Sequence, residues 1–169
     1  VNAAGTAALA NAGDGISVNG APGNRIGGSN AGEGNLISGN AKAGIYLNTS
    51  GAAANRVEGN LIGTAAGGLT ALGNGFAGIT LSAAVSNSIG GSVAGARNII
   101  SGNRQDGLFA SAGSVGNSIL GNLIGVNING TAALSNSFTG VTLDSSSFNL
   151  VGGDPAGARS VISANGDIG

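Results

Sequence analysis

Short apolar segments, each bounded by glycine or asparagine, recur along the whole chain. The clearest of them alternate apolar and polar residues, as in Gly15-Ile-Ser-Val18, Gly78-Ile-Thr-Leu81 and Gly140-Val-Thr-Leu143. Alternation with a period of two, rich in β-branched residues, predicts short β-strands. No stretch of useful length shows the apolar period of about 3.6 residues that marks an amphipathic helix.

These segments return with a fixed period. Five matching elements each open with asparagine, at intervals of 31, 32, 30 and 32 residues: Asn24-Arg-Ile-Gly-Gly, Asn55-Arg-Val-Glu-Gly, Asn87-Ser-Ile-Gly-Gly, Asn117-Ser-Ile-Leu-Gly and Asn149-Leu-Val-Gly-Gly. A period of about 20–50 residues is typical of a solenoid, in which each unit buries its apolar face against its neighbours. We therefore predict an all-β parallel β-helix with three short strands and about 31 residues per turn, five to six turns long, in one domain over residues 1–169.

Two kinds of unit alternate, and they differ in the place of an insertion. Odd units insert between the first and second strands, at Ser29–Gly34, Ser92–Arg97 and Asp154–Arg159, and even units insert between the second and third, at about 64–77 and 126–139. Side chains alternate along an extended strand, so only one apolar column of the second strand can face inward. The two columns are Leu36/Leu61/Ile99/Leu123/Val161 and Ile37/Ile62/Ile100/Ile124/Ile162. We expect the even insertions to fold back over the other column with their large apolar residues, Leu9, Leu72, Phe76, Leu134 and Phe138.

The recurring asparagines have a structural role in such a coil. Asparagine tolerates the left-handed backbone conformation that a sharp corner needs. Stacked coils also place identical amides about 4.8 Å apart, close enough to hydrogen-bond. We predict two ladders, Asn24/Asn55/Asn87/Asn117/Asn149 and Asn35/Asn60/Asn98/Asn122, the second ending at Ser160.

Composition excludes several classes of function. A net charge of −1 offers no basic field for nucleic acid and no polybasic patch for a membrane surface. The absence of any apolar run near 18 residues argues against membrane insertion. Cysteine and histidine are both absent, which removes disulfides, thiolate catalysis and the commonest metal ligands. We expect no cofactor and no metal.

Several turn and core motifs resemble those of a known class of repeat. They are Ala96-Arg-Asn-Ile-Ile-Ser-Gly-Asn103, Gly59-Asn-Leu-Ile-Gly-Thr64, Gly130-Thr-Ala-Ala-Leu134 and Gly78-Ile-Thr-Leu81. Together they are similar to the right-handed parallel β-helix repeats of large bacterial secreted and surface proteins, within the superfold that includes pectate lyases. The resemblance implies a right-handed coil and an extracellular or cell-surface segment of a longer repetitive protein. It carries over no catalytic residue.

The acidic residues do not suggest an active site. A polysaccharide-degrading enzyme needs clustered carboxylates, for calcium binding or for acid/base work. No two of the seven acids share a column when the sequence is folded onto its repeat. We therefore expect no catalysis by this segment.

One outward column suggests a binding face. The third strand presents Ser17, Tyr46, Thr80, Phe109 and Thr142 in one column, with Asn48 and Ser82 in the next outward position. Aromatic rings beside small hydroxyls and amides can stack sugar rings or dock a partner. An ordinary β-surface with two exposed aromatic residues is the simpler interpretation.

Two hypotheses of function follow from these observations. The first is a non-enzymatic structural and adhesive solenoid, which associates end to end with itself or binds a surface glycan. The second is a carbohydrate-binding or polysaccharide-degrading β-helix that uses the outer face of the third strand.

Overall fold

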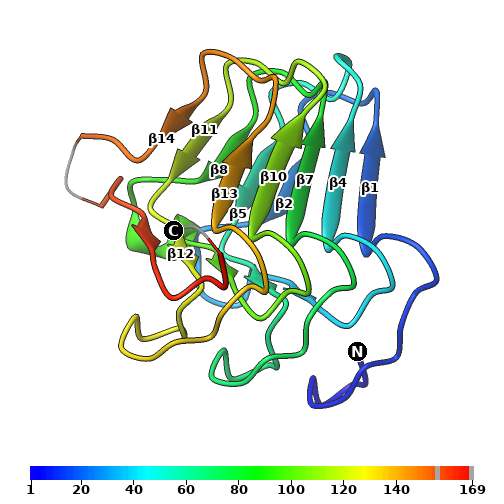
Figure 1. Cartoon of the computed structure of the whole chain (residues 1–169), viewed down its shortest axis with the longest axis vertical. Helices are drawn as coiled ribbons and strands as arrows, with labels where there is room; N and C mark the ends of the chain where they lie inside the picture. Colours follow the sequence, from blue (N-terminus) through cyan, green and yellow to red (C-terminus); the bar gives the residue numbers. More distant parts are fainter. Residues whose placement is uncertain (155–156, 168–169) are drawn as a thin grey trace.

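The computed structural model describes residues 1–154 and 157–167. The middle of the predicted Asp154–Arg159 insertion, and the last two residues of the predicted domain, lie outside the described part. The described chain winds through three parallel sheets and has no α-helix; one short 3-10 helix, η1 (Ala94–Ala96), lies in an insertion. Figure 1 shows the coils stacked side by side.

Each sheet contains five strands, one from each successive coil. Sheet A comprises β1 (Ile16–Asn19), β4 (Ile45–Asn48), β7 (Ile79–Ser82), β10 (Leu108–Ser111) and β13 (Val141–Leu143). Sheet B comprises β2 (Arg25–Gly27), β5 (Arg56–Glu58), β8 (Ser88–Gly90), β11 (Ser118–Leu120) and β14 (Leu150–Val151). Sheet C comprises β3 (Leu36–Ile37), β6 (Leu61–Ile62), β9 (Ile99–Ile100), β12 (Leu123–Ile124) and β15 (Val161–Ile162).

The period predicted from the sequence is confirmed, and the number of turns is corrected. The chain forms an all-β parallel solenoid with about 31 residues per turn, but it makes about 4 turns rather than five to six. Five strands in a sheet enclose only four turns between the first strand and the last. Residues before β1 and after β15 add no further strand within the described part of the chain.

The core consists of the inward columns of all three sheets. Ile45, Ile79 and Leu108 are fully buried in register on sheet A, and Val57 and Ile89 are fully buried on sheet B. Sheet C contributes its second column, of which Ile62, Ile100 and Ile124 are fully buried. One continuous cluster therefore runs along the solenoid, as stacked repeats require.

The other column of sheet C faces outward, as the alternation of side chains predicts. Ile99 and Leu123 are nevertheless only 3% exposed, because Val126 of an even insertion packs against them. An even insertion therefore does cover this column, as predicted, but several of the residues expected to form the cover do not do so. Leu9 is 68% exposed and Phe138 is 52% exposed, so neither covers this column.

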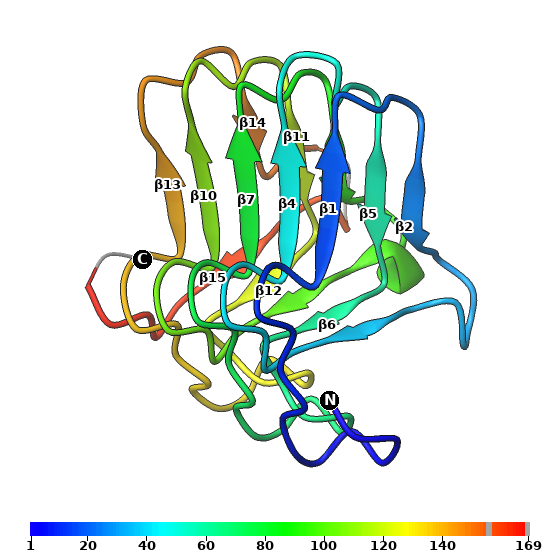
Figure 2. The same ribbon diagram turned by 90° about the vertical axis from the view of Figure 1, so that its right-hand side faces the viewer.

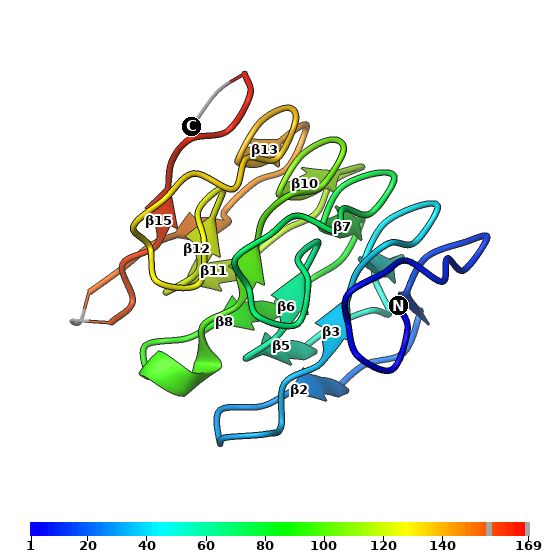
Figure 3. The same ribbon diagram turned by 90° about the horizontal axis from the view of Figure 1, so that it is seen from below.

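The insertions form two sets of lobes. Odd lobes span 28–35 and 91–98 and begin again at 152, and Figure 3 shows them in a row along one side of the molecule. Even lobes span 1–11, 64–74 and 126–136 and project at the foot of Figure 1. The even lobes stack on one another: the Ala66 N–H donates to the Gly5 carbonyl at 3.0 Å, and the Ile128 N–H donates to the Gly68 carbonyl at 3.0 Å.

Several corners turn through left-handed residues, but these are not the asparagines. Ala54, Ser86 and Phe148 have φ of 54°, 55° and 56°, and each directly precedes an asparagine of the first ladder. Gly59 and Gly121 hold the same place before asparagines of the second ladder. No asparagine in the described part of the chain has a positive φ. The expectation that asparagine itself makes the corner was wrong: the residue before it turns the chain.

Candidate ligand-binding face on sheet A

The central asparagines of the first predicted ladder, Asn55, Asn87 and Asn117, are buried in the interior and are not available to a ligand. This ladder is confirmed by amide-to-amide hydrogen bonds between successive coils. Asn87 shows the pattern: its Oδ1 accepts from the backbone N–H and the Nδ2 of Asn55 at 2.9 and 3.0 Å. Its own Nδ2 donates to the Ala52 carbonyl at 2.9 Å and to the Asn117 Oδ1 at 3.0 Å.

The second predicted ladder is confirmed in the same way, with one correction to the role of its asparagines. The Asn60 Nδ2 donates to the Asn98 Oδ1 at 3.0 Å, and the Asn98 Nδ2 donates to the Asn122 Oδ1 at 3.0 Å. Asn35 joins the ladder through Asn60, and the ladder ends at Ser160, whose Oγ accepts from the Asn122 N–H at 3.2 Å. Asn60 and Asn98 are fully buried, and neither has the positive φ expected of a corner residue. These two amides therefore link the coils; they neither turn the chain nor face a ligand.

A third ladder was missed by the sequence analysis. Its amides are linked by Nδ2–Oδ1 distances of 2.8–2.9 Å and belong to Asn11, Asn40, Asn74, Asn103, Asn136 and Asn165. Their spacing alternates between 29 and 33–34 residues, because every second interval contains an even insertion. The signal was present in recurring motifs such as Ile37-Ser-Gly-Asn40 and Ile100-Ser-Gly-Asn103, and the column becomes visible once the insertions are removed from the alignment.

The predicted outward column of sheet A exists as a row across five strands. Ser17, Tyr46, Thr80, Phe109 and Thr142 are paired in register. Asn48 and Ser82 share the next outward position, and both are half-buried. The Tyr46 hydroxyl donates to the Asn48 Oδ1 at 3.1 Å. The strands that carry this row stand side by side in Figure 2.

A further aromatic residue joins this row from an insertion. Phe76, which the sequence analysis expected to cover sheet C, packs edge-on against Phe109, with ring centroids 6.1 Å apart and an interplanar angle of 89°. Phe138 holds the equivalent place in the next even insertion, two residues before the glycine that precedes β13. The chain has only one tyrosine and four phenylalanines. Four of these five rings therefore belong to sheet A or to the corner that leads into it.

Thr80 is buried, although the sequence analysis placed it on an exposed face. Its exposed fraction is 7%, because the neighbouring strands place Tyr46 and Phe109 on either side of it. Its Oγ1 is the only buried side-chain oxygen or nitrogen of the described residues without a hydrogen-bond partner. An unpaired buried hydroxyl costs about 1–3 kcal/mol, so Thr80 is a locally unfavourable feature of an otherwise satisfied interior.

A groove of about 350 Å³ opens on this face between the aromatic residues. Tyr46, Phe76 and Thr80 line it together with Asp14 and Lys42. Asp14 is fixed by its Oδ1, which accepts the Ala43 N–H at 3.0 Å. The groove therefore combines two aromatic rings with one acidic and one basic side chain. Thr142, farther along the row, lies outside it and donates its hydroxyl to the Asp106 Oδ1 at 2.9 Å.

The described residues contain two salt bridges, and both lie away from the groove. Arg56 binds Glu58 at 2.6 Å, and Arg25 binds Glu33. Hydrogen bonds from the Asn30 side chain and backbone lower the pKa of Glu33, and the charge of Arg25 lowers it further. Neither Asp14 nor Lys42 takes part in a salt bridge, so the two charges line one groove without pairing.

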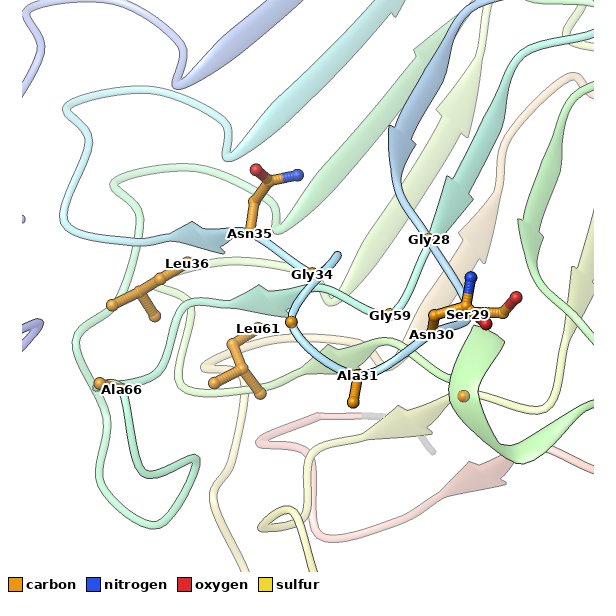
Figure 4. A pocket seen from close by; sticks show the side chains of 12 residues that line it. Gly28, Ser29, Asn30, Ala31, Gly34, Asn35, Leu36, Gly59, Leu61 and Ala66 are labelled. Carbon is orange, nitrogen blue, oxygen red and sulfur yellow. The ribbon is translucent and has the colours of Figure 1, made fainter.

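A larger hollow of about 570 Å³ lies over sheet C, beside the Arg25–Glu33 pair. Figure 4 shows the odd lobe from Gly28 to Gly34 on one side of it and Leu36, Leu61 and Ala66 on the other. Ala66 stands where the next even lobe has Ile128, and Gly34 stands where the next odd lobe has Arg97. The hollow is therefore lined, at these two positions, by small side chains where the following odd and even units have large ones. Its lining carries no charged side chain.

Comparison with known proteins assigns no family to this chain. No family model, no curated protein and no solved structure matches the chain. Within the described residues, no cluster of three or more histidine, cysteine or acidic side chains is arranged to hold a metal ion. The described part also contains no helix with the length and apolar character needed to cross a membrane.

Proposed function

We propose that this chain is a non-enzymatic structural and adhesive segment: a rigid β-solenoid that spaces and presents a binding face. The observation that carries the proposal is the set of three asparagine ladders, which link one coil to the next along the stack. Each amide inside a ladder, such as Asn87, is linked to the coils on both sides, which resists separation of the coils. The single core that runs through all the coils adds to this stiffness.

The polarity of the ladders supports end-to-end association as part of this function. In each link, the N–H groups of one coil donate to the Oδ1 of the next, as from Asn24 to Asn55 at 2.7 and 3.0 Å. A stack of coils therefore has amide oxygens facing one way and N–H groups facing the other. Such a stack is complementary to another of its kind placed head to tail. Sedimentation over a wide concentration range tests this part of the proposal, and a monomer at every concentration would contradict it.

We place the segment outside the cell or at its surface, within a longer repetitive protein of the bacterial β-helix type that its motifs resemble. A single lysine, with no methionine and no tryptophan, leaves few trypsin sites and little to oxidise, which suits an extracellular repeat. Detection of the parent protein in culture supernatant or on intact cells with an antibody tests the location. Exclusive recovery from the cytoplasm would contradict it.

A second candidate is a carbohydrate-binding β-helix, and the aromatic row on sheet A favours it. Tyr46, Phe76 and Phe109 give flat apolar surfaces, with the Asn48 amide and the Ser82 hydroxyl in the neighbouring column. Aromatic rings flanked by hydrogen-bonding groups suit the apolar face and the hydroxyls of a sugar ring. A glycan array combined with a reducing-end release assay separates the candidates. Binding without release supports adhesion, whereas any turnover contradicts the non-enzymatic proposal.

A further inference from the structure

We propose that the groove between Tyr46 and Phe76 is a binding site for a small zwitterionic group, one that carries an ammonium and an anionic group close together. The inference rests on the adhesive function proposed above, because it names the chemistry that one part of the sheet A face recognises. It depends on the contents of the groove and not on the ends of the solenoid.

The aromatic rings of the groove offer a surface for a cation. Tyr46 and Phe76 line the groove from two different elements, strand β4 and the corner before β7. Contact with Phe109 holds the Phe76 ring edge-on, at 6.1 Å between centroids. Electron-rich ring faces attract alkylated ammonium groups, which pair apolar surface with positive charge.

The groove also contains one acidic and one basic side chain, Asp14 and Lys42. The Asp14 carboxylate uses Oδ1 to accept the Ala43 N–H and forms no salt bridge with any described residue. Lys42 lines the same groove and is also without a salt bridge in the described chain. Charges of opposite sign that line one groove without pairing are complementary to a ligand that carries both signs. We infer that Asp14 and the rings bind the ammonium, and that Lys42 binds the anionic group.

The volume of the groove and the polar groups that line it limit the size and the chemistry of the ligand. A volume of about 350 Å³ is near the lower end of small-molecule sites, so the groove fits a single small group and not a long polymer. Thr80 lines it with a buried hydroxyl that has no partner. Because this hydroxyl is buried, the polar groups left for a ligand are chiefly the two charged side chains. A neutral sugar ring would use these charges less fully than a zwitterion does.

The test is titration of the whole chain by NMR with ligands that differ only in charge. Glycine betaine and γ-butyrobetaine are the zwitterionic probes, choline and acetate carry one charge each, and methyl glucoside is neutral. We expect saturable shifts at Tyr46 and Phe76 with at least one betaine, and binding about three- to tenfold weaker for choline and for acetate. Equal binding of choline, preferential binding of methyl glucoside, or no binding of either betaine would overturn the proposal.

Matched variants separate binding from folding. D14N keeps an oxygen for the Ala43 N–H while removing the charge, and K42Q removes the charge of an exposed side chain. Each should weaken betaine binding about three- to fivefold, whereas D144N and F138A, outside the groove, should leave it unchanged. A uniform response of all four variants would contradict the assignment. Loss of betaine binding with retained binding to the glycan array would remove the zwitterion site but leave the adhesive function standing.

Discussion

The two faces of sheet A differ in how strictly they repeat. On the inward face, Ile45, Ile79 and Leu108 form one fully buried column of similar aliphatic residues. On the outward face, the residue type changes at every step, from Ser17 to Tyr46 and Thr80. The inward face repeats because each coil must pack on the next with the same shape. The outward face is free of that constraint, so its residues can vary, and we propose that its aromatic residues and its groove bind a ligand.

The largest effect should come from breaking an asparagine ladder at its centre. Asn87→Ala would leave the Asn55 N–H and Nδ2 without a partner, whereas the Asn117 Oδ1 keeps the backbone N–H of residue 87 and the Ala52 carbonyl keeps the Val85 N–H. We expect a loss of about 2–6 kcal/mol in the free energy of unfolding, since each of these two buried unpaired donors costs about 1–3 kcal/mol. Denaturant titration measures it. Asn24→Ala, at an exposed position, is the matched control and should cost far less.

Truncating an inward aliphatic side chain should be the next largest change. Ile79 is fully buried between Ile45 and Leu108, so Ile79→Ala should lower the free energy of unfolding by about 2–5 kcal/mol. Ser82→Ala, on the half-buried outer side of the same strand, should stay within about 0.5 kcal/mol. Similar losses for the two variants would show that the faces do not differ as described.

Thr80 gives a change of opposite sign. Its hydroxyl is buried without a partner, so Thr80→Val should raise the free energy of unfolding by about 1 kcal/mol. Thr142→Val is the control, because the Thr142 hydroxyl donates to Asp106 and its removal should destabilise the protein. If both variants destabilise it equally, the Thr80 hydroxyl has a partner in solution.

The smallest effect concerns Glu33 and acidic pH. Hydrogen bonds from Asn30 lower the pKa of Glu33 in the folded state, so its ionised form favours folding at neutral pH. This contribution should begin to fade as pH falls below 4.5, the ordinary pKa of the group, and disappear once pH is below the folded pKa. Glu33→Gln should therefore be slightly less stable than the wild type near pH 6, and this difference should shrink as pH falls below 4.5. Thermal unfolding across that range measures the difference, and a gap that widens at low pH would contradict the assignment.

The sequence predicts the parts of this fold that repeat strictly. The strands, the period, the inward columns and two asparagine ladders follow from alternation and spacing around residues such as Ile79 and Asn87. The third ladder was not predicted because the even insertions change the spacing of its asparagines. The burial of Thr80 was not predicted because it depends on aromatic rings from neighbouring coils. Phe76 was expected to cover sheet C but packs on Phe109 instead, since the path of an insertion is set by tertiary contacts.

The groove could not have been assembled from the sequence alone for the same reason. Asp14, Lys42 and Phe76 come from the corners of three successive coils, outside the alternating strands that reveal the register. Whether these three side chains line one groove depends on the backbone path by which each coil leads into its sheet A strand. Local pattern gives the position of Tyr46 on its strand, but not which corner residues surround it.

We propose that the interior builds the solenoid while the outer face of sheet A binds a ligand. The most direct test replaces Tyr46 and Phe109 together by threonine, the residue already present at Thr80 and Thr142 in the same row. Binding to the betaines and to the glycan array is then measured beside the unfolding midpoint. We predict binding by the wild type, its loss in the double variant, and an unfolding midpoint that changes little. Binding that survives the double substitution, or that is lost only together with folding, would overturn this assignment of the binding face.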